Sequence, residues 1–155
     1  MKRIFTAALT AALLFLLTGC KDGKTEDFTV TVRNITGAQI SGITMYPENG
    51  TIDSTNRLSE NLPTGSEVSI SFGALTEDEI SKGFAITAYN AEDGTSGDLS
   101  QLHLKNGSKL TLYTDDWGLA AAVDMTDDEV NELYERDHAD YIAAQTEAAS
   151  ENTDN

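Results

Sequence analysis

The stretch FTVTVRN, residues 28–34, alternates apolar with polar side chains along most of its length. Successive side chains of a β-strand point to opposite faces, so this period of two is typical of a strand that buries one face. Residues 34–37, NITG, follow at once and favour a turn. The stretch therefore predicts a half-buried strand that opens a β-rich domain.

The same alternation predicts six more strands along the chain. They cover residues 40–46, 67–72, 84–90, 99–104, 109–114 and 119–124. Seven short strands with turn residues between them are typical of a sandwich or a barrel. We predict a mainly β fold, a single antiparallel β-sandwich of about seven strands over residues 28–124, with a C-terminal amphipathic helix.

The Asn-Gly pair at residues 106–107 predicts a turn between two of these strands. A two-residue loop would place the leucines of the flanking strands on opposite faces. A three-residue loop over 105–107, with Gly107 in the left-handed conformation, instead sets Leu102 opposite Leu110. We therefore expect a hairpin that joins residues 99–104 to 109–114.

Two segments have the spacing of helices. Thr76 precedes Glu79 at the distance of a capping box, which predicts one or two helical turns that cross from one sheet to the other. Thr126 and Glu129 repeat this spacing at the start of a longer helix, predicted over 125–143. Its apolar stripe comprises Val130, Leu133, Tyr134, His138, Tyr141 and Ile142. We expect its first half to pack on the domain and its end to be free.

Composition and charge limit the possible functions. The 155 residues are 39% hydrophobic and 23% charged, which is typical of one globular domain with a single core. The 26 acids and 10 bases give a net charge of −16, which repels phosphate backbones and predicts no binding to nucleic acid. Residues 144–155 contain few apolar side chains, so we expect a disordered acidic tail there.

The first nineteen residues have the layout of a secretory signal. Lys2 and Arg3 precede an apolar run over residues 4–17. This run is shorter than the ~20 residues that a membrane-spanning helix needs. We therefore assign residues 1–19 to a signal peptide.

The run ends in Leu17-Thr18-Gly19-Cys20, an aliphatic residue and two small ones before a cysteine. This segment resembles the lipobox of bacterial lipoproteins. The resemblance implies cleavage before Cys20 and a diacylglycerol on its thiol, which would anchor the chain to the membrane of a bacterial cell envelope on the extracytoplasmic side. Residues 20–27 would then form a tether. The alternative is an ordinary signal peptide whose sole cysteine lies near the cleavage site.

The body of the chain shows a second resemblance, over about residues 28–114. The matching residues are 28–37, Ile40, Ile43, Leu58, 62–65, 68–72, 84–86, 92–94, 102–104 and 110–112. They are similar to a set of small extracytoplasmic bacterial proteins, many of them lipoproteins of anaerobic Gram-positive bacteria. Relatives often carry a tryptophan in the segment that corresponds to residues 47–60, where this chain has none. The resemblance implies a small β-sandwich and no defined activity.

The sequence contains no catalytic motif, since nucleophile-elbow, metalloprotease, P-loop and dinucleotide patterns are all missing. His103 alternates with two leucines and is expected to face solvent. His138 lies on the apolar stripe and is expected to be a packing residue. We therefore predict a protein without enzymatic activity and without a cofactor.

Two groups of residues are candidate sites. Asn90, Glu92, Asp93 and Asp98 offer oxygen ligands for Ca²⁺, although they do not have the EF-hand spacing and Asp93 is more simply a turn residue. Trp117, with Asp115 and Asp116, lies between two predicted strands. An exposed indole would anchor a binding partner, whereas a buried one would cap the core, and we expect burial.

The leading hypothesis is a lipid-anchored, extracytoplasmic binding or accessory module of unknown ligand, either a protein or an envelope glycan. The first alternative is an envelope-associated hydrolase or sugar-processing domain, which requires a cleft with convergent ionisable groups. The second is a surface module stabilised by calcium.

Overall fold

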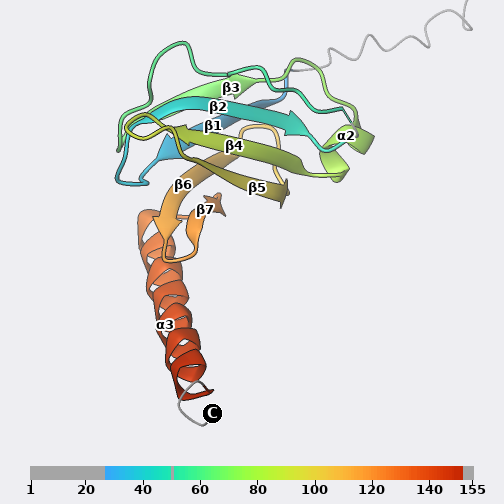
Figure 1. The fold of residues 1–155 in the computed structure, drawn as a ribbon. Coiled ribbons are helices and arrows are strands. Elements are labelled where there is room, and N and C mark those ends of the chain that lie inside the picture. Colours follow the sequence, from blue (N-terminus) through green and yellow to red (C-terminus); the bar gives the residue numbers. More distant parts are fainter. Residues whose placement is uncertain (1–26, 50, 152–155) are drawn as a thin grey trace, which may run out of the picture.

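The computed structural model describes residues 27–49 and 51–151, which form a two-layer β-sandwich with a long C-terminal helix (Figure 1). One sheet has the strand order β3-β1-β6-β7 and the other has the order β2-β4-β5. The strands are β1 (Thr29–Asn34), β2 (Ile40–Pro47), β3 (Glu67–Ser71), β4 (Phe84–Asn90), β5 (Ser96–Leu102), β6 (Lys109–Asp115) and β7 (Gly118–Val123). The predicted fold class, mainly β with seven strands and a C-terminal helix, is confirmed.

Alternation along β1 positions the core as predicted. Its residues alternate between half-buried and buried, and Val30 and Val32 are fully enclosed between the two sheets. Phe28 stacks on Phe84 with ring centroids 5.1 Å apart and forms an edge-to-face pair with Phe72 whose centroids are 6.1 Å apart. These three rings close the sandwich at the end where β1 begins, because Phe28 lies just before that strand.

The predicted hairpin between β5 and β6 is wrong, because these strands belong to different sheets. Leu102 pairs with Phe84 on β4, whereas Leu110 pairs with Val32 on β1 and Val123 on β7. The turn itself has the expected left-handed Gly107, with φ of 85°. Its amide donates to the carbonyl of Thr29 at 2.7 Å, so the turn carries the chain from one sheet to the other.

The sandwich is also not wholly antiparallel, since β1 and β6 run parallel. A parallel pair needs a long crossover connection, and residues 35–108 supply it. Four successive residues of β6, from Leu110 to Tyr113, are buried, because both faces of this strand are covered. Alternation alone reveals neither the partner of a strand nor its direction.

A buried amide fixes the end of β1. Asn34 is fully enclosed, and its Nδ2 donates to the carbonyls of Ala38 and Leu62, both at 2.9 Å. Its Oδ1 accepts from the backbone amide of Thr36 at 3.0 Å and from the Thr36 hydroxyl at 2.8 Å. One side chain thereby holds residues 36–38, which lead to β2, against the segment that leads to β3.

Two capping boxes start the helices as predicted. Helix α2 (Glu77–Ser81) connects β3 to β4, and thus one sheet to the other, with Thr76 and Glu79 bonded reciprocally. Helix α3 (Asp127–Glu151) begins after Thr126, whose amide donates to Glu129 at 2.7 Å. None of the helices in the described ranges is long and apolar enough to span a membrane.

Helix α3 packs at its start and then leaves the sandwich (Figure 1). Val130 is buried with Tyr113 of β6 and Ala122 of β7, whereas Ile142 is 50% exposed, as expected of a free end. The helix continues past the predicted end at 143 to Glu151, because alanine, glutamate and glutamine there favour helix. The first part of the expected disordered tail 144–155 is therefore helical, and residues 152–155 lie outside the described range.

Replacement of Asn34 by alanine should lower the free energy of unfolding by about 3 kcal/mol. The change leaves two carbonyls and an amide without their partner inside the protein, and each buried unsatisfied group costs ~1–3 kcal/mol before relaxation. Urea unfolding followed by circular dichroism measures the effect. Asn131→Ala, on the exposed face of α3, is the matched control and should change stability by less than about 0.5 kcal/mol. Equal stabilities of the two variants would contradict the role of Asn34.

Candidate functional site

Trp117 lies at the tip of the β6–β7 hairpin and is 63% exposed, so the expected burial is wrong. The Oδ1 atom of Asp115 accepts from the amides of Trp117 and Gly118 at 2.8 and 2.9 Å. This turn, completed by a positive φ of 130° at Gly118, directs the indole away from the core. Local turn chemistry therefore outweighs the general tendency of tryptophan to be buried.

Helix α3 supports the hairpin tip from one side. The ring of Tyr141 meets the Trp117 indole edge-on, with centroids 5.0 Å apart. His138 Nδ1 bonds to the carboxylate of Asp116, and the Tyr134 ring stacks parallel to the imidazole at 6.4 Å. We call the side chains of Trp117, Tyr134, His138 and Tyr141 the tip surface. Trp117, Asp115 and Asp116, predicted as one binding group, thus lie together, and α3 adds three residues to them.

Carboxylates border the tip surface and shift the pKa values of neighbouring side chains. The carboxylate of Asp116 raises the pKa of His138 through a hydrogen bond and through its charge. Burial, reinforced by Asp137 and Asp115, raises the pKa of Tyr113 to about 12, and its hydroxyl donates to Asp137 at 3.4 Å. Tyr113 therefore remains a neutral donor at physiological pH and helps to hold α3 on β6.

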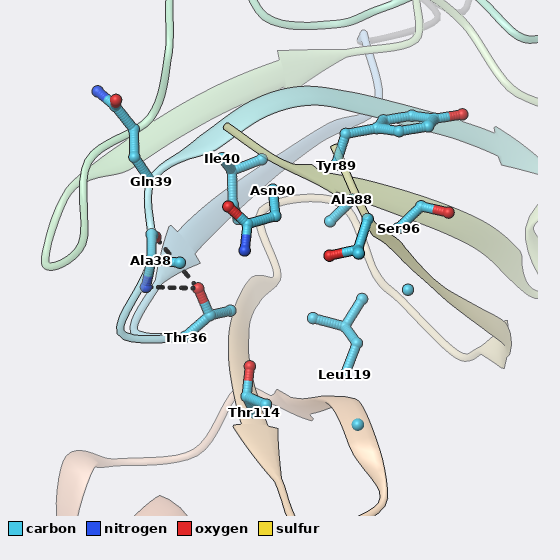
Figure 2. A pocket seen from close by; sticks show the side chains of 13 residues that line it. Thr36, Ala38, Gln39, Ile40, Ala88, Tyr89, Asn90, Ser96, Thr114 and Leu119 are labelled. Atoms are coloured by element: carbon cyan, nitrogen blue, oxygen red, sulfur yellow. Dashed lines mark hydrogen bonds between the residues drawn. The ribbon is translucent and has the colours of Figure 1, made fainter. Parts of the chain in front are cut away.

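A pocket of about 250 Å³ opens between the two sheets, close to the hairpin (Figure 2). One wall is the segment that leads into β2, a second is the β4–β5 hairpin, and the third is the β6–β7 hairpin. The lining residues are Thr36, Ala38, Gln39, Ile40, Ala88, Tyr89, Asn90, Thr95, Ser96, Gly97, Thr114, Gly118 and Leu119. The lining combines apolar and uncharged polar groups.

A close approach of β5 to β7 shapes this pocket. A Cβ atom at Gly97 would lie 2.4 Å from the Cβ of Leu119, so only glycine fits there without displacing a strand. The two strands belong to different sheets, and this contact sets the distance between their free edges. Asn34 fixes the opposite wall, because its amide holds Thr36 and Ala38 in place.

Three of the four residues predicted as calcium ligands use their side-chain oxygens within their own turns and strands. Asn90 Oδ1 accepts from the amide of Glu92 at 2.8 Å, and Asp93 Oδ1 accepts from the amide and hydroxyl of Thr95. Asp98 lies on β5, where it accepts from the Thr87 hydroxyl at 2.5 Å. Across the described residues, no three histidine, cysteine or acidic side chains are grouped so as to hold a metal ion.

The remaining predicted residues lie apart from both features. His103 follows β5 and is exposed, as expected. His138, expected to be a packing residue, is exposed and pairs with Asp116 instead. Cys20, the predicted lipid attachment site, lies outside the described residues. The sequence does not predict the pocket, because its walls come from segments that are distant in sequence.

No family model matches the sequence, and no curated protein matches it. Among solved structures, the chain is similar to one named as the NMR structure of the protein from Eubacterium rectale. The alignment has a TM-score of 0.48 and 14% sequence identity, and it covers 70% of this chain and 98% of that chain.

The contact between the hairpin tip and α3 should depend on pH. The pKa of His138 is raised, so the ion pair with Asp116 is complete below about pH 6.5, the ordinary value, and is lost as pH rises through the raised pKa. Glu135 also raises this pKa, and the Tyr134 ring lies parallel to the imidazole with centroids 6.4 Å apart. NMR titration of the imidazole measures the pKa directly.

Asp116→Asn should return the pKa of His138 toward its ordinary value, because the amide carries no charge. Trp117 is the sole tryptophan, so its fluorescence reports the same transition. This transition should be absent in His138→Gln. An unchanged His138 pKa in Asp116→Asn would contradict the role of the ion pair.

Proposed function

We propose that the chain is a lipid-anchored, extracytoplasmic binding module without enzymatic activity. Its tip surface would recognise a cationic segment of a protein partner. The observation that carries this proposal is the 63% exposure of Trp117 on a hairpin tip that helix α3 supports from one side. Tryptophan buries more apolar area than other side chains, and it is enriched among the residues that dominate binding energies.

The tip surface is organised before any partner arrives. The Asp115 carboxylate fixes the turn, Asp116 bonds to His138, and Tyr141 supports the indole. Binding to a surface that is already ordered loses less conformational entropy than ordering a flexible loop. The bracing therefore favours recognition by Trp117 over a purely structural role for the hairpin.

Charge selects the class of partner. Helix α3 contains nine acids and one base, Arg136. Carboxylates attract a cationic partner over the distance of the Debye length, and the exposed aromatic faces then hold an arginine or lysine by cation–π contact. An anionic glycan or a phosphate would be repelled by the same field.

The position of the tip surface agrees with an anchor at Cys20. Arg33, at the end of β1, pairs with Asp127 at the start of α3, so the helix begins at the opposite end of β1 from Phe28. Residues 20–27 extend at most about 28 Å. With a lipid at Cys20, the end of the sandwich near Phe28 would lie toward the membrane and the tip surface would lie away from it.

The proposed lack of catalysis is supported by the surroundings of the ionisable groups. His138 is exposed on a helix face and bonds to Asp116, without a nucleophile in this pair. In the described part of the chain, every residue that lines the pocket between the sheets is uncharged. The lining therefore offers no acid, no base and no histidine.

Trp117→Ala should weaken binding of an arginine-rich peptide to the full chain about tenfold, because it removes the indole and keeps the charges. Isothermal titration calorimetry at low salt is the measurement. Ile52→Ala is the matched control, since Ile52 is 78% exposed and lies beside Tyr46 and Glu48 at the end of β2, and its affinity should equal that of the wild type. Equal affinities for Trp117→Ala and wild type would show binding by charge alone and contradict the proposal.

Cys20→Ser should release the chain from the membrane. The lipid is the proposed anchor, and two acyl chains hold a protein durably because each buried CH₂ contributes ~0.8 kcal/mol. Mass spectrometry of the native product should show an acylated N-terminal Cys20, and fractionation should find the Cys20→Ser variant outside the membrane fraction. A native chain that retains Met1 and carries no lipid would contradict this part of the proposal.

A further inference from the structure

We infer that the pocket between the sheets binds one uncharged, hydroxyl-rich ring, the chemistry of a single neutral monosaccharide unit. This site is separate from the tip surface and does not depend on the proposed recognition by Trp117. Its volume of about 250 Å³ is below the ~300–1,000 Å³ of pockets for drug-sized ligands, so it suits a small ligand.

The polar groups of the pocket converge from different elements. Asn90 ends β4, Ser96 begins β5 and Thr114 lies near the end of β6. In Figure 2 the Asn90 amide and the Thr114 hydroxyl approach the same space from opposite walls, with Ser96 at the side. The sequence separates Asn90 from Thr114 widely, so this convergence is a product of the tertiary fold.

These three polar groups are available to a ligand. The Oδ1 atom of Asn90 is occupied by the amide of Glu92, an arrangement that leaves its Nδ2 donor facing the pocket. Within the described part of the chain, no hydrogen bond to a protein group engages Asn90 Nδ2, Ser96 Oγ or Thr114 Oγ1. Hydroxyl groups of a sugar both donate and accept, so they match one amide donor and two hydroxyls that do either.

Apolar atoms form the rest of the pocket. Ile40 and Ala88 are 3% and 6% exposed, and Leu119 projects toward them from β7 (Figure 2). A sugar ring presents C–H groups on its faces and hydroxyls at its rim. The apolar residues therefore suit its faces, and the polar groups suit its rim.

Charge excludes other ligands of similar size. The chain carries −16, which disfavours an anion, and the described lining contains no carboxylate to compensate a cation. The neighbouring Asp93 is turned to Thr95, which lowers the pKa of this carboxyl by hydrogen bonding. A neutral ligand is not repelled by the net negative charge and needs no charged partner in the pocket.

The test is NMR titration of the full chain in detergent with glucose, galactose and N-acetylglucosamine, each added separately. At least one sugar should shift the amide signals of Ala88, Asn90, Ser96 and Leu119 and saturate, with a dissociation constant on the order of 1 mM. Glucuronate, the charged counterpart of glucose, should bind at least about tenfold more weakly than that sugar. Absence of saturable shifts at these residues with all three neutral sugars would overturn the inference.

Two variants assign the binding to the pocket. Thr114→Val keeps the shape of an exposed side chain and removes its hydroxyl, and Asn90→Ala removes the amide donor. Each should weaken binding about tenfold, whereas Asn131→Ala on α3 should leave it unchanged. Equal affinity in all three variants, or shifts centred on Trp117, would overturn the inference while leaving the peptide test of the tip surface unaffected.

Discussion

The enclosed amide of Asn34 is the constraint on which both candidate surfaces depend. It accepts and donates two hydrogen bonds each, and removal from water makes each of these costly to leave unmade. The amide holds Thr36 and Ala38 where they form one wall of the pocket. It also fixes the end of β1, so that the preceding residue, Arg33, reaches Asp127 and starts α3 beside the sheet.

The sequence predicts the elements of this fold better than their pairing. Alternation in residues 28–34 depends on burial of one face and is therefore visible locally. The partner of a strand depends on segments that are distant in the sequence and therefore leaves no local pattern. The leucines at 102 and 110 satisfy a hairpin rule, yet the turn between them bonds to Thr29 on β1 and sends β6 to the other sheet. The parallel pairing of β1 with β6 leaves no local signal.

The sequence predicts the grouping of residues at the candidate site but not their exposure, for a related reason. Asp115, Asp116 and Trp117 are adjacent in sequence, so their grouping was visible, but exposure of the indole follows from the Asp115 turn and from contact with Tyr141 on α3. The apolar stripe of α3 contained a signal, since His138 and Tyr141 are one turn apart and both face the hairpin tip. The helix extends past 143 because helix-forming residues continue there even though apolar ones end.

The two surfaces differ in chemistry because carboxylates border the tip surface, whereas the pocket is lined by uncharged residues. Carboxylates at the border of the tip surface favour the cationic partner that we propose, and its aromatic rings would suit that partner. The pocket lies next to the tip surface, because its lining residues Gly118 and Leu119 directly follow Trp117. Its described lining nevertheless carries no charge. A neutral ligand is indifferent to a field that attracts cations and repels anions. The two proposed ligands would therefore not compete, although the β6–β7 hairpin carries Trp117 and also forms one wall of the pocket, because one ligand is cationic and the other is neutral.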